Sequence, residues 1–257
     1  MKHMRIILFM FSLLVSGALR SQGTTHSDLG LQLKSIMPSP FEITPQYDRN
    51  DFPYVQAASG TSYGVQLSYS RDFNAHWGAR ALLDGSLYST GLRLRLPPEE
   101  DPDPNGFGFG HYDFFDSMEG KRISASLGVY YVIDVKWLEL KPLVGLNLNT
   151  HVWEIMELSH NARLTNPPTR VEVFRVIVGR SRKFNLNPIV GLNASVKLSK
   201  LVNLELGMQY IPDQNESLFG TYTALAMSGE YEGLLSNTEE RLEFAVGVSF
   251  NLPTSSN

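Results

Sequence analysis

A period of two in the apolar residues is the feature that most limits what this chain can fold into. In residues 202–210, apolar side chains occupy the even positions, while Asn, Glu, Gly and Gln occupy the odd ones. Successive side chains of a β-strand point to opposite faces, so this pattern predicts a strand rather than a helix. The same alternation predicts eight strands, at residues 29–34, 63–70, 77–96, 123–133, 137–150, 186–198, 202–210 and 241–252.

The third of these segments changes phase along its length. Leu83 and Leu87 occupy the odd positions, whereas Leu92 and Leu94 occupy the even ones. An extra unpaired residue in one strand produces such a shift, so we predict a β-bulge at residues 89–91.

The connections between the predicted strands alternate in length. Short links fall at residues 72–76, 134–136 and 199–200, and long links at residues 36–60, 97–120, 152–185 and 211–237. Short turns on one rim and long loops on the other are typical of outer-membrane barrels. We therefore predict an all-β fold, an eight-stranded antiparallel up-and-down transmembrane β-barrel over residues 28–252. A soluble periplasmic β-domain with its aliphatic rows inside is the alternative.

The first eighteen residues predict a signal peptide. Lys2 and Arg5 lie in a basic start, residues 6–15 are almost entirely apolar, and small residues follow at positions 16–18. This order is typical of a secretory signal, and the apolar run is shorter than a transmembrane helix requires. We expect export and an outer-membrane location. The net charge of −4, without a basic run, argues against a nucleic-acid partner.

The polar rows are expected to face the lumen, because only lipid tolerates nearly unbroken aliphatic rows outside. They carry charges at Lys34, Arg80, Asp84, Glu139, Lys141, Lys197, Glu205, Arg241 and Glu243. We expect these to neutralise one another, because an unpaired buried charge is costly; a gated ion path is the alternative. Phe73, Trp77 and Trp137 lie beside the short turns and predict an aromatic girdle.

Residues 194–207 (ASVKLSKLVNLELG) and 242–252 (LEFAVGVSFNL) resemble the small outer-membrane barrels of the OmpA/OmpX and PorT-like kind. The resemblance covers about residues 28 to 252. It implies an eight-stranded barrel anchored in the outer membrane, with a structural, adhesive or assembly role.

The long link at residues 97–120 contains half of a calcium-loop motif. Asp101, Asp103 and Asn105 match D-x-D-x-N-G, but Tyr112 stands where the bidentate Glu is expected. An acidic, solvated loop explains the same residues, and we expect no cofactor.

A catalytic site has little support in the sequence. His111, His151 and His160 lie in or near long links, with Ser117, Ser159, Asp113 and Glu157 in the same links, but none has motif spacing. Residues 161–183 are rich in arginine and β-prone, which predicts a hairpin arm that is either solvated or bound to lipopolysaccharide phosphates.

We therefore expect a non-enzymatic protein with a structural, surface-interaction or secretion role carried by its long loops. Its expected partners are outer-membrane lipid and lipopolysaccharide, with another envelope or secretion protein as a possible loop partner. The alternatives are an outer-membrane enzyme of the lipid A or peptide hydrolase type, with its site on the long-loop rim, and a narrow solute channel.

Overall fold

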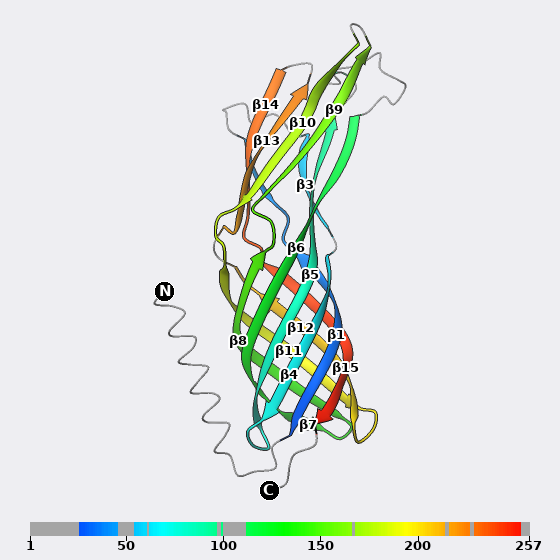
Figure 1. Cartoon of the computed structure of the whole chain (residues 1–257), viewed down its shortest axis with the longest axis vertical. Helices are drawn as coiled ribbons and strands as arrows, with labels where there is room; N and C mark the ends of the chain where they lie inside the picture. Colours follow the sequence, from blue (N-terminus) through cyan, green and yellow to red (C-terminus); the bar gives the residue numbers. More distant parts are fainter. Residues whose placement is uncertain are drawn as a thin grey trace.

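The computed structural model is built of β-strands and describes residues 26–45, 54–60, 62–96, 99, 112–165, 168–213, 216–226 and 229–252. A barrel forms its lower part, and a second group of strands continues above the barrel (Figure 1). The predicted signal peptide and calcium loop lie outside the described residues. Among those residues, no helix is long and apolar enough to cross a membrane.

Eight antiparallel strands form the barrel, as predicted. They are β1 (Ser27–Pro38), β4 (Ser62–Asp72), β5 (Trp77–Leu96), β6 (Tyr112–Tyr131), β8 (Leu138–His151), β11 (Asn185–Lys197), β12 (Val202–Ile211) and β15 (Arg241–Leu252). The first strand closes the ring by pairing with both β15 and β4. A short strand, β7 (Ile133–Val135), pairs with the start of β8.

The two faces of the barrel strands differ sharply in polarity. Leu31 and Leu67 point outward and are each 50% exposed, whereas their neighbours Gln32 and Gln66 point into the lumen and are each 1% exposed. The outward face of every barrel strand repeats this apolar pattern. An apolar band around the barrel suits hydrocarbon as its solvent. The closed ring suits it as well, because no barrel strand is left with an unpaired edge.

The β-bulge predicted at residues 89–91 is wrong, because β5 pairs with β6 without any register shift over its whole length. Even-numbered side chains point inward throughout β5, so Asp84 and Leu94 share a face and are both buried. The outward face changes in the opposite sense, from exposed Leu87 to exposed Arg93. The change of phase in the sequence therefore reflects different environments at the two ends of one regular strand. Apolar side chains face outward in its lower part and inward in its upper part.

The long connections form a folded unit above the barrel, which we call the head. Its main sheet has the order β2 (Glu42–Pro45), β14 (Gly229–Asn237), β13 (Leu218–Ala226), β10 (Pro168–Arg180) and β9 (Ile155–Thr165). The predicted hairpin arm is present as β9 and β10, although it belongs to this sheet instead of standing alone. A further strand, β3 (Val55–Ser59), pairs with the upper part of β5.

The head has its own hydrophobic core between the upper part of β5 and the five-stranded sheet. Leu92 and Leu94 of β5 pack in one buried cluster with Phe174 and Val176 of β10 and with Tyr222 of β13. Each of these side chains is almost fully buried. The head is thus held by apolar packing between two layers and is not a set of independent loops.

The short-turn rim carries the predicted aromatic residues. Trp137 is 69% exposed and Trp77 is half exposed, while Phe73 is partly buried. Trp77 packs edge-on against Tyr131 at 5.1 Å between ring centroids. Exposed indole rings at this level are suited to a membrane interface, where one side of the ring contacts hydrocarbon and the other contacts water.

We predict that Leu94→Ala loosens the head and leaves the barrel closed. The substitution removes a fully buried side chain, and such cavities cost about 2–5 kcal/mol. The measurement is the rate of limited proteolysis of the head, with the heat-dependent gel shift reporting on the barrel. Leu87→Ala is the matched control, because Leu87 lies on the outward face of the same strand. Equal proteolysis of the two variants would contradict a packed head core.

Candidate functional site

The lumen is filled by paired charges in its upper part. Lys34 Nζ lies 2.7 Å from Asp84 Oδ1 and 2.9 Å from Glu243 Oε2. Arg241 Nε donates to the other oxygen of Glu243 at 2.7 Å, and Arg122 approaches that same oxygen at 3.3 Å. All five side chains are buried. Because cations and carboxylates surround one another here, their charges are largely neutralised within the barrel.

A second group fills the middle of the lumen. Arg80 Nη2 and Gln32 Nε2 both donate to Glu205 Oε2 at 2.5 Å. Gln66 donates to Gln32 at 2.7 Å and so extends the network to the next strand. These side chains come from β5, β1, β12 and β4, so the network crosses the barrel instead of following its wall.

The lower lumen is closed by a third group. Lys141 Nζ lies 3.0 Å from Glu139 Oε2 and 3.9 Å from Asp28 Oδ2, and the Tyr130 hydroxyl donates to Asp72 at 2.5 Å. A cavity of about 10 Å³ bordered by Arg80, Tyr130 and Lys141 has room for about one water molecule. The described lumen thus contains side chains where a channel would need continuous open space.

Seven of the nine charges predicted for the lumen are buried there: Lys34, Arg80, Asp84, Lys141, Glu205, Arg241 and Glu243. Glu139 takes part from the rim, where its side chain is 41% exposed. The prediction is wrong for Lys197, which is exposed at the last residue of β11. The alternating pattern directs its side chain inward, but the strand ends at the short-turn rim, where the side chain can reach water.

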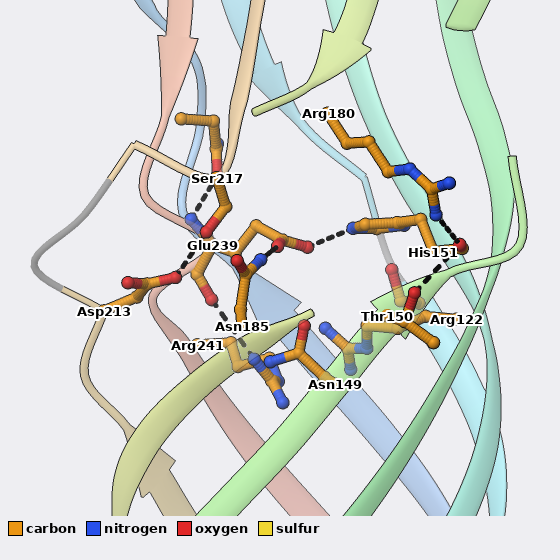
Figure 2. A network of polar contacts seen from close by, with 12 residues as sticks. Arg122, Asn149, Thr150, His151, Arg180, Asn185, Asp213, Ser217, Glu239 and Arg241 are labelled. Carbon is orange, nitrogen blue, oxygen red and sulfur yellow. Dashed lines mark hydrogen bonds and ion pairs between the residues drawn. The ribbon is translucent and has the colours of Figure 1, made fainter. Parts of the chain in front are cut away.

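At the top of these charges lies a group of buried polar residues that we call the collar, formed by Glu239, His151, Asn185, Arg122 and Arg241 (Figure 2). Arg122 and Arg241 also belong to the upper charge group. Glu239 is at its centre and is fully buried. One carboxylate oxygen contacts His151 Nε2, and the other accepts a hydrogen bond from Asn185 Nδ2 at 2.9 Å. Arg122 and Arg241 supply positive charge close to this carboxylate.

The backbone at Glu239 is held in an unusual conformation. Its φ angle is 56°, in the left-handed region that non-glycine residues rarely occupy. Its amide donates to Asn237 Oδ1 at 2.6 Å, while Asn237 Nδ2 donates to the carbonyl of Ser39 at 2.8 Å. Such strain persists where surrounding contacts fix the residue, so the position of Glu239 is strongly determined by the fold.

The electrostatics of the collar favour an ionised Glu239, which lies in the link between β14 and β15. Burial by itself raises the pKa of this carboxyl, but the hydrogen bond and charge of His151, followed by the charges of Arg122 and Arg241, outweigh it. The pKa falls from 4.5 to about 2. A depressed pKa contributes stability above pH ~4.5 that is lost as the pH falls toward 2.

His151 joins the collar to the core of the head. Its ring lies edge-on to Tyr88 at 5.2 Å and close to Trp153 at 4.9 Å. Its backbone carbonyl accepts a hydrogen bond from Arg180 of β10 at 2.8 Å. One residue therefore contacts the charged lumen through its imidazole nitrogen and the aromatic base of the head through its ring.

Of the residues considered for catalysis, His111 lies outside the described residues and His151 is buried. The side chains of His151 and Glu239 are 2% and 0% exposed, so the pair has no surface on which to meet a substrate. Glu157 lies on β9 and forms an ion pair with Arg175 at 2.6 Å. His160 and Ser159 lie on β9 as well. Among the described residues, no group of three or more His, Asp or Glu side chains is placed to hold a metal ion.

Four charged members of the network were missed by the sequence analysis: Asp28, Asp72, Arg122 and Glu239. Asp28 and Arg122 lie one residue before the predicted starts of their strands, and Asp72 lies in a predicted short link. Glu239 lies between the predicted link at residues 211–237 and the predicted strand at residues 241–252. Extending the period of two by a single residue would have placed Asp28 and Arg122 on the inward face. Nothing in the local sequence marks Glu239, because its burial depends on chain segments far away in the sequence.

Comparisons with known proteins support the fold at low sequence identity. No protein-family model and no curated protein sequence matches the chain. The outer membrane protein OprG from Pseudomonas aeruginosa aligns with a TM-score of 0.50 and 9% identity, over 90% of this chain and 98% of OprG. Neisserial surface protein A gives 0.39 and 12%, over 87% of this chain and 97% of its own. The structural neighbours are thus small outer-membrane barrels.

We predict that Glu239→Gln destabilises the protein by about 3–5 kcal/mol, because it leaves the buried Arg122 and Arg241 without part of their counter-charge. The measurement is the midpoint of urea unfolding from lipid vesicles. Glu154→Gln is the matched control, because Glu154 pairs with Arg180 but its side chain is 83% exposed, and such pairs contribute at most about 1 kcal/mol. A midpoint for Glu239→Gln equal to that of the control would contradict the role of the collar.

Proposed function

We propose that this chain is a non-enzymatic outer-membrane protein whose sealed barrel anchors a folded head for contact with another envelope or secretion protein. The observation that carries the proposal is the core of the head, in which Leu94, Phe174 and Tyr222 are buried between two sheets. Binding through a preformed surface loses less conformational entropy than binding through loops that must first become ordered.

The filled lumen supports an anchoring role over a conducting one. Three groups of paired charges cross the barrel, and Glu239 with His151 covers them from above. The buried position of His151 is unfavourable to an enzyme that acts on lipid or peptide. The apolar outer wall and the fold shared with OprG support a place in the outer membrane.

The proposed topology puts the head outside the cell and the short turns in the periplasm. The chain contains no cysteine, so single cysteines provide unambiguous labels. We predict that Glu232→Cys, on an exposed position of β14, reacts with a membrane-impermeant maleimide on intact cells. Lys200→Cys, in an exposed short turn, should react only after the outer membrane is permeabilised. The reverse order of labelling would contradict the proposed orientation.

We predict that the purified protein gives no stable conductance steps in planar bilayers at neutral pH. The reason is that Lys34, Arg80 and Glu205 occupy the path that ions would take. A known porin measured in the same bilayers serves as the positive control. Reproducible unitary steps from the folded protein would overturn the anchoring role and favour the narrow channel.

A further inference from the structure

A groove lies on the outer wall of the barrel, just below the collar. It has a volume of about 480 Å³ and crosses β1, β4, β5 and β6. Its apolar lining includes Leu33, Tyr63, Val65, Leu87, Ile123 and Val152, all exposed on the outward face. A volume of this size lies within the range of sites that hold small ligands, about 300–1,000 Å³.

The groove exists because one outward side chain is missing from a row. Across neighbouring strands the register aligns Leu33 with Val65, Val65 with Gly85, and Gly85 with Ile123. Directly opposed residues lie about 4.5–5.5 Å apart, so Val65 and Ile123 stand on either side of Gly85. A Cβ built at Gly85 would meet nothing within 4 Å. The glycine therefore forms the floor of a hollow between aliphatic side chains.

A cation stands at the upper end of the hollow. Lys121 lines the groove and is the cross-strand partner of Leu87, one row above Gly85. Its side chain is exposed, and its carbonyl accepts the amide of Val152 at 2.8 Å. Glu119 is exposed two residues nearer the head, one step further from the apolar band.

The level of Lys121 coincides with the upper edge of the apolar band. On β5, the outward face is apolar at Leu87 and carries an exposed Arg93 above it. Lipid headgroups are expected at such a boundary, with acyl chains below. The hollow therefore lies at the depth of the chains, and the ammonium group of Lys121 lies at the depth of the headgroup phosphates.

We propose that this groove binds the lipid A part of lipopolysaccharide, with one acyl chain over Gly85 and a phosphate on Lys121. The inference rests on the outer-membrane location and orientation proposed above. With the head outside the cell, the groove lies in the outer leaflet, whose lipid contains lipid A. Charge complementarity selects a phosphorylated lipid, since a lysine ammonium binds phosphate as a point charge. The missing side chain at Gly85 selects a flexible chain, which can lie against a shallow apolar floor.

Native mass spectrometry of the folded protein, released from detergent with added lipid A, tests the proposal. The wild type is expected to retain one molecule of lipid A. Gly85→Leu places a side chain in the hollow, where its Cβ meets no atom within 4 Å, and should reduce retention by about tenfold or more, equivalent to about 1.4 kcal/mol. Lys121→Gln should reduce retention to a similar degree and remove the preference for phosphorylated over dephosphorylated lipid A.

Two control variants separate the groove from general effects on the wall. Lys200→Gln removes the same charge at the short-turn rim, and Val144→Leu enlarges an exposed residue on β8. Both should retain lipid A like the wild type, and every variant must show the heat-dependent gel shift of a closed barrel. Undiminished retention by Gly85→Leu, or an equal loss in the controls, would overturn the proposal.

The source of the phosphate is tested by replacing lipid A with phosphatidylglycerol. Retention of phosphatidylglycerol equal to that of lipid A would overturn the assignment to lipid A. The cysteine labelling described above tests location independently of lipid binding. Correct labelling with no retained lipid A would therefore refute the groove alone, whereas reversed labelling would refute the proposed function.

Discussion

The pairing of β1 with β15 is the contact on which the rest of the structure depends. Every residue of β1 from Ser27 to Pro38 has a partner on β15, so the first and last barrel strands close the ring. In a hydrocarbon solvent an open edge would leave unpaired amides and carbonyls, each costing several kcal/mol. Closure removes that edge, and it also creates the enclosed lumen in which the charged residues must then find partners.

The collar solves a problem that arises where the barrel meets the head. On β5 the inward face carries Asp84 below the collar and Leu94 above it, whereas the outward face changes from Leu87 to Arg93. Charges at that boundary have water on neither side. There Glu239 contacts His151, Arg122 adds positive charge close to the Glu239 carboxylate, and the His151 ring presents a surface against which Tyr88 packs.

The sequence predicted the barrel because its strands obey one simple rule, the period of two, and its loops obey another, the alternation of length. It also placed Lys34, Arg80 and Glu205 correctly, since inward direction follows from position alone. The predicted bulge in β5 was wrong because a periodic pattern shows which residues share a face of a strand. It does not show whether that face is apolar or polar in its environment. The head and the position of Glu239 depend on contacts between distant segments, such as Asn237 with Ser39, which local patterns do not encode.

A lumen filled with ion pairs needs an explanation, because paired charges seldom stabilise an interior better than well-packed apolar groups do. The outward rows must be apolar to meet lipid, so an apolar lumen would make both faces of every strand alike. A slip of one residue in register would then carry little cost. With Gln32 beside Leu31 and Glu205 beside Leu206, the same slip would place a polar amide and a charge in lipid. The polar lumen therefore specifies which face is inside and fixes the register on which closure depends.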